Sequence, residues 1–283
     1  MRAFLILLLC LVPGTLDAQE IKCKHFFQGM PSVDTTPSEI IIRDCYALQT
    51  NRETKFPAWV AYRLTLREVC GTLDLGRKWR TDPWLAADAT LETNRDDYRG
   101  AATLLYDRGH LVPLASFKGS LNASQVNYYS VIAPQRRALN RGPWLDLENA
   151  VRDLVWSEGS VYVIVGPLYE KKMAPLPNAD EPHRVPSGFW MIVAAPTGVN
   201  IEYDSGTGNY SNGTQAVGFI VSQVPGLYNS IRDFIVPIQE IEARAAIQVF
   251  PNMDEVEAAR VKGSVSWYWI DDTFLEGDYY VEE

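Results

Sequence analysis

Cysteine, histidine and long apolar runs are all scarce in this sequence. Its 283 residues include 4 cysteines and 3 histidines, and no two cysteines stand in a CxxC pair. Zinc ribbons and thioredoxin-type redox proteins therefore lack their usual signature here. The longest uncharged apolar run spans residues 3–12, which is too short for a bilayer crossing of about 20 residues. We expect a soluble mature protein without a membrane-spanning helix.

Several catalytic signatures are missing as well. The sequence has no HExxH, no GxSxG and no Walker loop, so zinc proteases, α/β-hydrolases and nucleoside triphosphatases are not indicated. It also has no internal repeat, low-complexity tract or Pro/Gly/Ser-rich linker. With 47% hydrophobic and 22% charged residues, the composition excludes disorder, collagen and coiled coil and indicates a globular protein.

The amino-terminal residues have the pattern of an export signal. Arg2 supplies a positive charge, residues 4–12 an apolar core, and Leu16-Asp17-Ala18 a cleavage site that ends in a small residue. We predict cleavage after Ala18 and a secreted or periplasmic protein. A lipoprotein signal at Cys10 is disfavoured, because Leu9 stands where a small residue is required.

Cleavage of the signal leaves three cysteines, Cys23, Cys45 and Cys70. An odd number in an exported chain predicts one disulfide bond and one spare thiol. Three pairings are open, and the sequence does not choose among them.

The chain divides into four parts. Residues 1–18 are the predicted signal peptide, residues 19–50 an N-terminal lead-in, residues 51–265 the principal domain, and residues 266–283 a tail rich in acids and aromatics. The last 13 residues carry six acids and no base, so we expect the tail to be solvated.

Strand patterns dominate the principal domain. They occur in residues 59–66, 160–166, 190–195 and 217–221. In the first segment, Val60, Tyr62 and Leu64 alternate with residues of the opposite face. The second is apolar and rich in β-branched residues, which is typical of a central strand buried on both faces.

One helix is predicted between Pro143 and Gly159, because apolar residues recur there every three or four positions. Long helices are otherwise few. The sequence therefore indicates an α+β fold with a mostly antiparallel central sheet flanked by helices.

His110 is the main candidate for acid–base chemistry among the three histidines. It lies in the segment Tyr106-Asp107-Arg108-Gly109-His110-Leu111. An imidazole can take up a proton near neutral pH, and the planar guanidinium of Arg108 can hold a phosphate. His25 and His183 lie outside this segment, and we expect them to be hydrogen-bonded scaffold residues.

A second group of polar residues follows downstream. Asn140 offers a neutral oxygen to a hard cation, and Glu148, about two helical turns further on, can accept hydrogen bonds from that cation's water shell. Arg152 follows Glu148 by four residues, so the two share a helix face. Mg²⁺ favours sites with few protein ligands and several waters. With His110, these residues indicate phosphoryl chemistry.

The order of these motifs is specific. Asp107-Arg108-Gly109-His110 is followed by Ala133-Pro134-Gln135 and then by Asn140, Trp144 and Glu148. This series resembles the DNA/RNA non-specific endonuclease family, the ββα-metal nucleases related to endonuclease G. Weaker similarities extend the resemblance to about residues 50–260, at residues 76–83, 165–169 and 183–187. The resemblance implies a ββα-metal (His-Me finger) core on the central sheet.

The resemblance implies roles for the residues that match the motifs. His110 would be the general base that activates water, and Asn140 the direct protein ligand of one Mg²⁺, for which Mn²⁺ can substitute. Glu148 would orient the waters on that ion.

The matched charged residues would handle the phosphate. Arg77, Arg108 and Arg152 correspond to arginines that hold it, and Asp107 corresponds to the acid that supports the site. One position departs from the family pattern, because an asparagine often stands where this chain has Val131. We expect that change to affect loop geometry and not the core reaction.

The motifs and the export signal together predict a secreted, Mg²⁺-dependent endonuclease. It would cut DNA and RNA with little sequence or sugar selectivity and leave 5′-phosphate ends. A homodimer and an inhibitor protein stay open as partners. Two alternatives also stay open, an inactive extracellular module that binds nucleic acid or another polyanion, and an effector or toxin nuclease.

Net charge has to be reconciled with a nucleic-acid substrate. The formal charge is −9 and the pI about 5.0, whereas nucleic-acid-binding domains are normally basic. Residues 71–152 are an exception within the chain, with 11 basic against 9 acidic residues. We therefore expect local phosphate contacts and loose, salt-sensitive binding.

Overall fold

The structure is a computed structural model that describes residues 21–34, 38–86, 89–91, 97–196, 203–204, 209–210 and 214–265. The predicted signal peptide (1–18) and the predicted tail (266–283) lie outside the described residues. Within those described ranges, no helix is long and apolar enough to cross a membrane.

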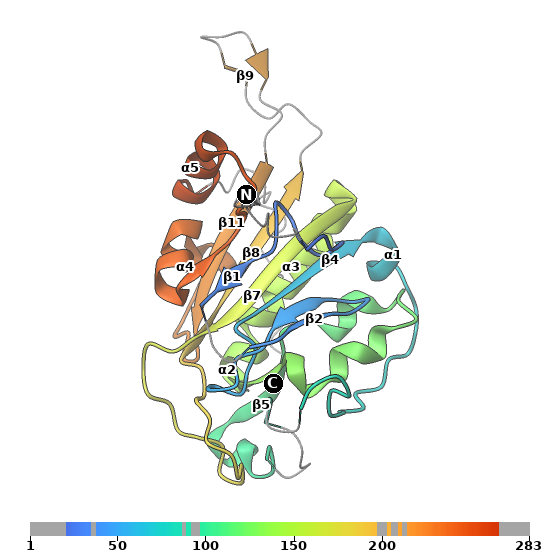
Figure 1. Ribbon diagram of the computed structural model, residues 1–283, viewed down its shortest axis with the longest axis vertical. Coiled ribbons are helices and arrows are strands. Elements are labelled where there is room, and N and C mark those ends of the chain that lie inside the picture. Colours follow the sequence, from blue (N-terminus) through green and yellow to red (C-terminus); the bar gives the residue numbers. More distant parts are fainter. Residues whose placement is uncertain are drawn as a thin grey trace, which may run out of the picture.

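A seven-stranded sheet forms the centre of the fold (Figure 1). Its strand order is β12-β11-β8-β7-β4-β3-β2, and every neighbouring pair is antiparallel. The strands are β2 (Ile40–Ile42), β3 (Ala47–Gln49), β4 (Trp59–Thr65), β7 (Ser160–Leu168), β8 (Gly188–Pro196), β11 (Thr214–Ser222) and β12 (Ile235–Val236). The predicted α+β fold with an antiparallel central sheet is confirmed.

The four long strands are the four segments that had strand patterns. In β4, Val60 and Tyr62 join one apolar cluster while Trp59 and Ala61 join another, as the alternation requires. Strand β7 pairs with β4 on one side and β8 on the other, so it is central and buried on both faces as predicted. β-Branched residues suit these positions because they pack well on a pleated surface.

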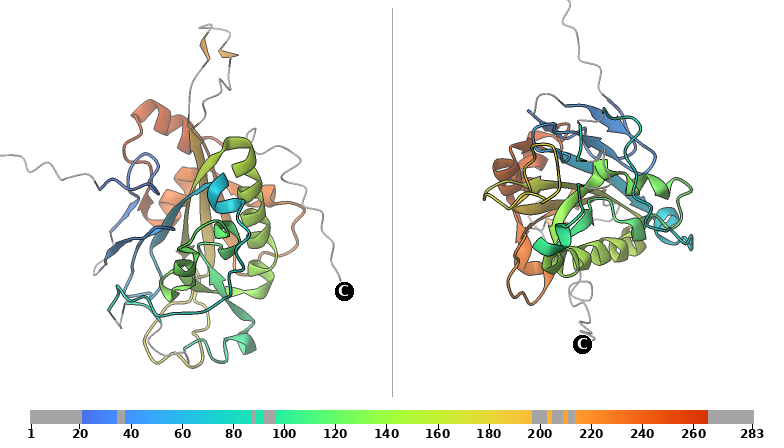
Figure 2. Two further views of the ribbon diagram at one scale, coloured as in Figure 1. Left: turned by 90° about the vertical axis from the view of Figure 1, so that its right-hand side faces the viewer. Right: turned by 90° about the horizontal axis from the view of Figure 1, so that it is seen from below.

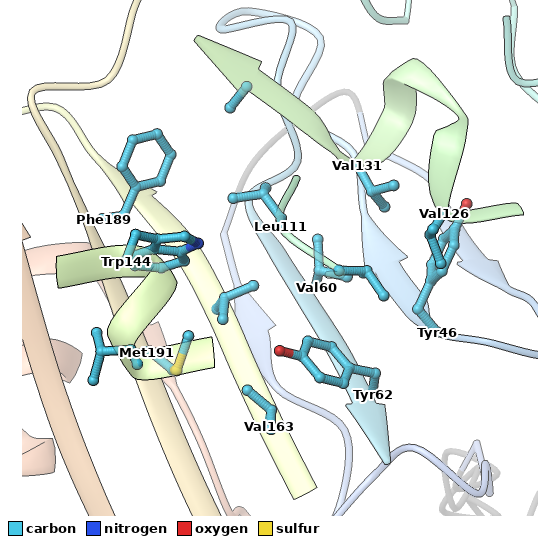
Figure 3. Close-up of a cluster of buried hydrophobic side chains, with 14 of the residues drawn as sticks. Tyr46, Val60, Tyr62, Leu111, Val126, Val131, Trp144, Val163, Phe189 and Met191 are labelled. Atoms are coloured by element: carbon cyan, nitrogen blue, oxygen red, sulfur yellow. The ribbon is translucent and has the colours of Figure 1, made fainter. Parts of the chain in front are cut away.

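The larger apolar cluster fills the face of the sheet that helix α3 covers (Figure 3). Helix α3 (Pro143–Glu158) begins with proline, whose missing N–H costs nothing in the first turn, and ends before Gly159 at φ +72°. It buries Trp144 next to Phe189 and Met191 of β8. The helix predicted from the apolar spacing is therefore confirmed at both ends.

The smaller cluster covers the opposite face. It contains Trp190 and Ile192 of β8 and lies under two carboxy-terminal helices, α4 (Ile238–Ala245) and α5 (Glu255–Gly263). These helices flank the sheet beside β11 (Figures 1 and 2). The sheet is thus a layer between two apolar cores.

The predicted lead-in contributes to this sheet. Residues 40–49 form β2 at the edge of the sheet, its neighbour β3 and the turn between them. Further toward the amino terminus, β1 (Ser32–Val33) pairs with β13 (Ile247–Gln248). The amino-terminal part of the chain therefore pairs both with the central sheet and with the carboxy-terminal strand β13.

Residues 66–159 leave the sheet after β4 and return to it at β7. A hairpin and two helices form the later part of this segment, namely β5 (Tyr106–His110), β6 (Ile132–Arg136), α2 (Arg137–Asn140) and α3. Its other elements are α1 (Leu66–Val69), η1 (Ala101–Leu104), η2 (Leu114–Phe117), η3 (Ala123–Asn127) and η4 (Tyr129–Val131). The remaining elements are η5 (Ile231–Phe234), β9 (Tyr203–Asp204) and β10 (Asn209–Tyr210).

The expected disulfide is not present in the structure. Cys23, Cys45 and Cys70 are all free thiols. Cys45 is buried, with its sulfur 3.6 Å from the Ser120 hydroxyl, whereas Cys70 is exposed. The number of cysteines alone does not predict a disulfide bond, because the bond also requires two cysteines whose side chains lie close together.

Candidate active site

A cavity of about 560 Å³ opens between the β5–β6 hairpin, the start of α3 and the segment around Trp79. Six of the seven predicted site residues line it, Arg77, Asp107, Arg108, His110, Asn140 and Glu148. The first and last of them, Arg77 and Glu148, are 71 positions apart in the chain, and the fold brings them to one cavity.

The hairpin sets the direction of the site's side chains. Arg108 lies opposite Pro134 and His110 opposite Ile132, and residues two apart on a strand point to the same face. Between them, Gly109 lies against Gln135, whose side chain would be 2.2 to 2.5 Å from a Cβ at that position. Only glycine fits there, which accounts for the glycine in Asp-Arg-Gly-His.

His110 is held in one tautomer. Its Nε2 lies 3.1 Å from Oδ1 of Asn127, and Nδ2 of Asn127 donates to the Gly76 carbonyl at 3.2 Å. A carbonyl only accepts hydrogen bonds, so the Asn127 amide must present its oxygen to the imidazole. Nε2 therefore carries the proton and donates it, which leaves Nδ1 as the basic nitrogen.

The surroundings of His110 favour the neutral ring. The pKa of His110 is lowered to about 4, mainly by burial and to a smaller extent by the nearby Arg77 charge, while the hydrogen bond with Asn127 opposes the shift. The Trp79 ring lies over the imidazole with centroids 5.0 Å apart. At neutral pH the ring is therefore uncharged and able to accept a proton.

Asn140 is oriented in a similar way by Asp107. Its Nδ2 donates to Oδ2 of Asp107 at 3.2 Å. An ionised carboxylate only accepts, so Oδ1 of Asn140 is the atom left for another partner in the cavity. Asp107 is itself anchored by Arg141 at 2.8 and 3.0 Å. Burial alone would raise the pKa of Asp107, but the hydrogen bonds from Arg141 and Asn140 outweigh it and lower the pKa.

Glu148 contributes a second oxygen donor from α3. Burial raises the pKa of its carboxyl to about 8, against the opposing effects of the Arg152 and Arg77 charges. A carboxyl group held in such surroundings would be stabilised as an anion by a nearby cation. The amide oxygen of Asn140 and the carboxylate of Glu148 are both the hard oxygen donors that Mg²⁺ and Mn²⁺ prefer. The donor set therefore fits a hard divalent cation.

The arginines differ in their placement. The Arg108 guanidinium lies over the Tyr98 and Trp79 rings, 5.3 and 5.7 Å from their centroids, while Arg77 is exposed at the cavity rim. Arg152 does not line the cavity. It donates to Ser116 at 3.2 Å and to Asn149, so it acts on Glu148 through charge and not through a shared cavity wall.

Three residues of the site were not singled out from the sequence. Trp79 lies within a motif segment, but nothing in its spacing distinguished it from a core tryptophan. Asn127 and Tyr98 belong to no motif, and only the fold shows that they contact His110 and Arg108. Val131, where the family often has asparagine, is fully buried in the larger apolar cluster.

The other two histidines have scaffold roles, as expected. His25 Nε2 lies 3.0 Å from the Arg43 carbonyl, and its Nδ1 accepts from the Arg63 N–H. His183 Nε2 accepts from the Leu176 N–H at 2.9 Å, and its Nδ1 lies 2.9 Å from the Glu181 carbonyl.

Comparison with known proteins decides the family. Residues 30–256 match the model of the DNA/RNA non-specific endonucleases. The chain belongs to this family. The nuclease of Serratia marcescens is 35% identical over 227 residues, which cover 77% of this chain and 78% of the bacterial protein. Human mitochondrial endonuclease G is 27% identical over 235 residues, covering 80% of this chain and 72% of the human protein.

The fold agrees with that assignment. A solved structure of the EndoG/EndoGI complex matches with a TM-score of 0.66 at 22% identity, covering 81% of this chain and 91% of the other. The DNA/RNA non-specific endonucleases are metal-dependent enzymes that hydrolyse nucleic acids. The resemblance inferred from the motifs, the enzyme class and the ββα-metal fold are therefore confirmed.

Proposed function

We propose that this member of the family is a Mg²⁺-dependent endonuclease that hydrolyses phosphodiester bonds of DNA and RNA with little selectivity for sequence or sugar. One observation carries the proposal. The same cavity is lined by His110, a neutral imidazole with a basic Nδ1, and by Asn140, whose amide oxygen is not bonded to Asp107. These are a proton acceptor and a cation ligand placed for one reaction.

His110 is the general base. Its Nδ1 takes the proton of a water molecule, and the Nε2–H bond to Asn127 keeps the ring in the required tautomer and orientation. The activated water attacks the phosphorus opposite the leaving oxygen. Cleavage of the bond to the 3′ oxygen, which takes up a proton from water, gives the 5′-phosphate and 3′-hydroxyl ends that the family resemblance implies.

Asn140 and Glu148 are the residues that would hold Mg²⁺, Asn140 directly and Glu148 through water. When bound, the ion supplies positive charge to the phosphate oxygens and to the leaving group, and Mn²⁺ is expected to substitute. Asp107 keeps the Asn140 oxygen turned toward the cavity.

Arg77 and Arg108 bind the phosphate. The planar face of Arg108 packs on Tyr98 and Trp79, which fixes the direction of its N–H groups. Charge that develops on the phosphate is thus met by donors already in position. Arg152 lies outside the cavity lining, and its charge favours the ionised form of Glu148 by lowering the pKa of that carboxyl.

Low selectivity follows from the kind of contact available. Phosphate contacts carry no sequence information, and none of the roles above requires a base edge or a 2′-hydroxyl. Because the chain is acidic overall, binding depends on these local cations, and we expect cleavage rates to fall steeply as salt is raised.

Export is part of the same proposal. The pattern of residues 2–18 supports a secreted or periplasmic enzyme that is cleaved after Ala18. A homodimer and an inhibitor protein stay open as partners, and the proposed reaction requires neither.

The experiment that tests the function is cleavage of supercoiled plasmid and of a structured RNA, with Mg²⁺ and with EDTA. We expect both nucleic acids to be cut only with the metal. His110→Ala should lower the rate by at least about 10²–10⁴-fold, since a positioned base contributes that much. Asn140→Ala should weaken the response to Mg²⁺, whereas Asn122→Ala, exposed and outside the cavity, should not.

Two results would contradict the proposal. Cleavage that persists in EDTA would exclude a metal-dependent reaction. A folded protein that binds both nucleic acids without cutting either would instead be an inactive binding module.

A further inference from the structure

Arg43 and Asp82 form a buried ion pair outside the lining of the active-site cavity. Their side chains are 3% and 0% exposed, and the Arg43 guanidinium donates to Oδ1 of Asp82. Arg43 lies in the turn between β2 and β3, within the predicted lead-in, whereas Asp82 follows the segment that carries Arg77 and Trp79. Burying two charges costs free energy that their attraction does not always repay, so the segments that the pair joins are more informative about its role than its own energy.

Asp82 joins two segments of the chain. Its Oδ2 accepts from the Ser130 hydroxyl at 2.6 Å, and its Oδ1 accepts from the Trp84 N–H at 3.0 Å. With the bond from Arg43, both carboxylate oxygens are therefore occupied. The segment of residues 76–84 is thus tied to the segment of residues 127–130.

The Arg43 side chain contacts aromatic rings of the same two segments. Its guanidinium carbon lies 4.0 Å from the ring centroid of Trp84 and 4.5 Å from that of Tyr128. A planar guanidinium can pack on aromatic rings while its N–H groups donate to a carboxylate, and the compact ammonium of lysine cannot replace both contacts. Arg43 therefore bonds to one segment and packs on both.

These two segments are the ones that hold His110. Backbone hydrogen bonds run from the Arg80 N–H to the Asn127 carbonyl at 3.1 Å and from the Tyr129 N–H to the Arg80 carbonyl at 3.0 Å. The Asn127 amide accepts from His110 Nε2, and Trp79 packs on the imidazole ring. The segments anchored by the ion pair thus supply both the acceptor and the aromatic ring that fix the imidazole.

We propose that Arg43 and Asp82 are positioning residues for His110, because they hold residues 76–84 and residues 127–130 together around its ring. The inference rests on the proposed role of His110 as the general base. A displacement of about 1 Å caused by a distant substitution can lower a rate by about 10²-fold, so a loosened junction would affect catalysis. A residue of the predicted lead-in thereby takes part in the chemistry of the cavity without lining it.

The experiment uses two variants of the full chain that leave no charge buried alone, because an unpaired buried charge is strongly destabilising. Arg43→Lys keeps a charge beside Asp82 but lacks the planar group, and Arg43→Met with Asp82→Asn removes both charges. With a short DNA duplex and Mg²⁺, we expect each variant to lower kcat by about 10–100-fold and to change KM less.

The matched control is Gln49→Leu, which removes a buried hydrogen bond elsewhere in the lead-in. Gln49 is 7% exposed and accepts from the Trp59 indole at 2.8 Å. This variant should unfold at a lower urea concentration than the unmodified protein but keep its kcat. It separates a loss of stability from a loss of positioning.

A second readout follows the imidazole itself and does not require activity. With ¹⁵N-labelled histidine, the ring resonances of His110 should show the Nε2–H form in the unmodified protein and a mixture of tautomers in both variants. His183, whose Nε2 accepts from the Leu176 N–H, has the opposite tautomer and is the internal reference.

The inference is overturned if the folded variants retain the single His110 tautomer or the unmodified kcat, or if Gln49→Leu changes them as much. Arg43→Lys alone decides if the double variant does not fold. An unmodified protein that cuts no nucleic acid would contradict the proposed function, and the tautomer of His110 would still show whether the ion pair positions its ring.

Discussion

At the scale of single residues, two asparagine amides set the chemistry of the site. Asn127 and Asn140 each direct an NH₂ group to a partner that can only accept, the Gly76 carbonyl and the Asp107 carboxylate. Each amide is thereby forced to present its oxygen to the reacting groups. Two neutral side chains thus determine which nitrogen of His110 is basic and which atom faces a cation.

Replacing Asn127 with leucine should impair His110 without removing it. The Nε2 proton loses its acceptor, so the second tautomer and other ring orientations become populated. We expect kcat to fall by about 10–100-fold with little change in KM, since outer contacts to a functional imidazole typically contribute that much. Initial rates would measure this. In a His110→Ala background the same substitution should have no further effect, and an equal loss in both backgrounds would show that Asn127 does not act through His110.

Asp107→Asn should act on the cation. The new amide can donate as well as accept, so Asn140 is no longer required to turn its NH₂ toward position 107. We expect the Mg²⁺ concentration for half-maximal activity to rise by about tenfold or more. Asp153→Asn, exposed on α3, is the control and should leave the Mg²⁺ titration unchanged. A loss of rate at an unaltered Mg²⁺ requirement would contradict the orienting role.

At the scale of elements, the β5–β6 hairpin determines where the base and the phosphate ligand stand. Its register places Gly109 opposite Ala133, and the Gln135 side chain fills the space beside it. The hairpin therefore depends on the absence of a side chain at one position. Neither strand has the alternating pattern of a half-buried strand, so only the family motif indicated it in the sequence.

Gly109→Ala should destabilise the protein through a clash. The added methyl would lie 2.2 to 2.5 Å from Gln135 atoms, and overpacking of this kind costs about 1–3 kcal/mol. Urea unfolding would measure the loss. Gly76→Ala is a matched control, because a Cβ there meets nothing within 4 Å. Equal stability of the two variants would mean that Gln135 can move aside without cost.

Elements of the fold were predictable where periodicity was strong. Strands β4 and β7 and helix α3 have apolar spacings that are typical of a sheet and an amphipathic helix, and both ends of α3 carried a terminal signal. The three-residue strands β2 and β3 are too short to show a period. Asn127 and Tyr98 could not be predicted, since their roles arise from contacts between segments that local patterns do not encode.

At the scale of the whole molecule, His25 joins the amino-terminal segment to the sheet. Strand β3 begins at Ala47, which pairs with Ala61, so Arg63 of β4 lies beyond the paired residues of β3. His25 Nδ1 accepts the Arg63 N–H instead, while Nε2 donates to the Arg43 carbonyl. The ring is 2% exposed, and burial lowers its pKa to about 4. The folded protein therefore holds this histidine neutral.

Stability should consequently fall on acidification. The unfolded chain binds a proton at His25 below pH 6.5, and the folded chain does so only near pH 4, so the free energy of unfolding decreases between these values and levels off below them. The full shift corresponds to about 3 kcal/mol. Because His110 titrates in the same range, urea unfolding from pH 7 to pH 4 would measure the His25 contribution as the difference between the wild-type protein and His25→Gln. His25→Gln should reduce the pH dependence, and an unchanged dependence would contradict the assignment.

The closure of residues 66–159 between two paired strands has a consequence for synthesis. Thr65 and Ser160 face each other across β4 and β7, and helix α3, which carries Glu148, packs on β7. As the chain leaves the ribosome, the residues that line the cavity emerge after β4 but before β7 and β8. Strand β8 is complete only at residue 196 of 283. The cavity wall is therefore completed only after β7 and β8 have been synthesised and have paired.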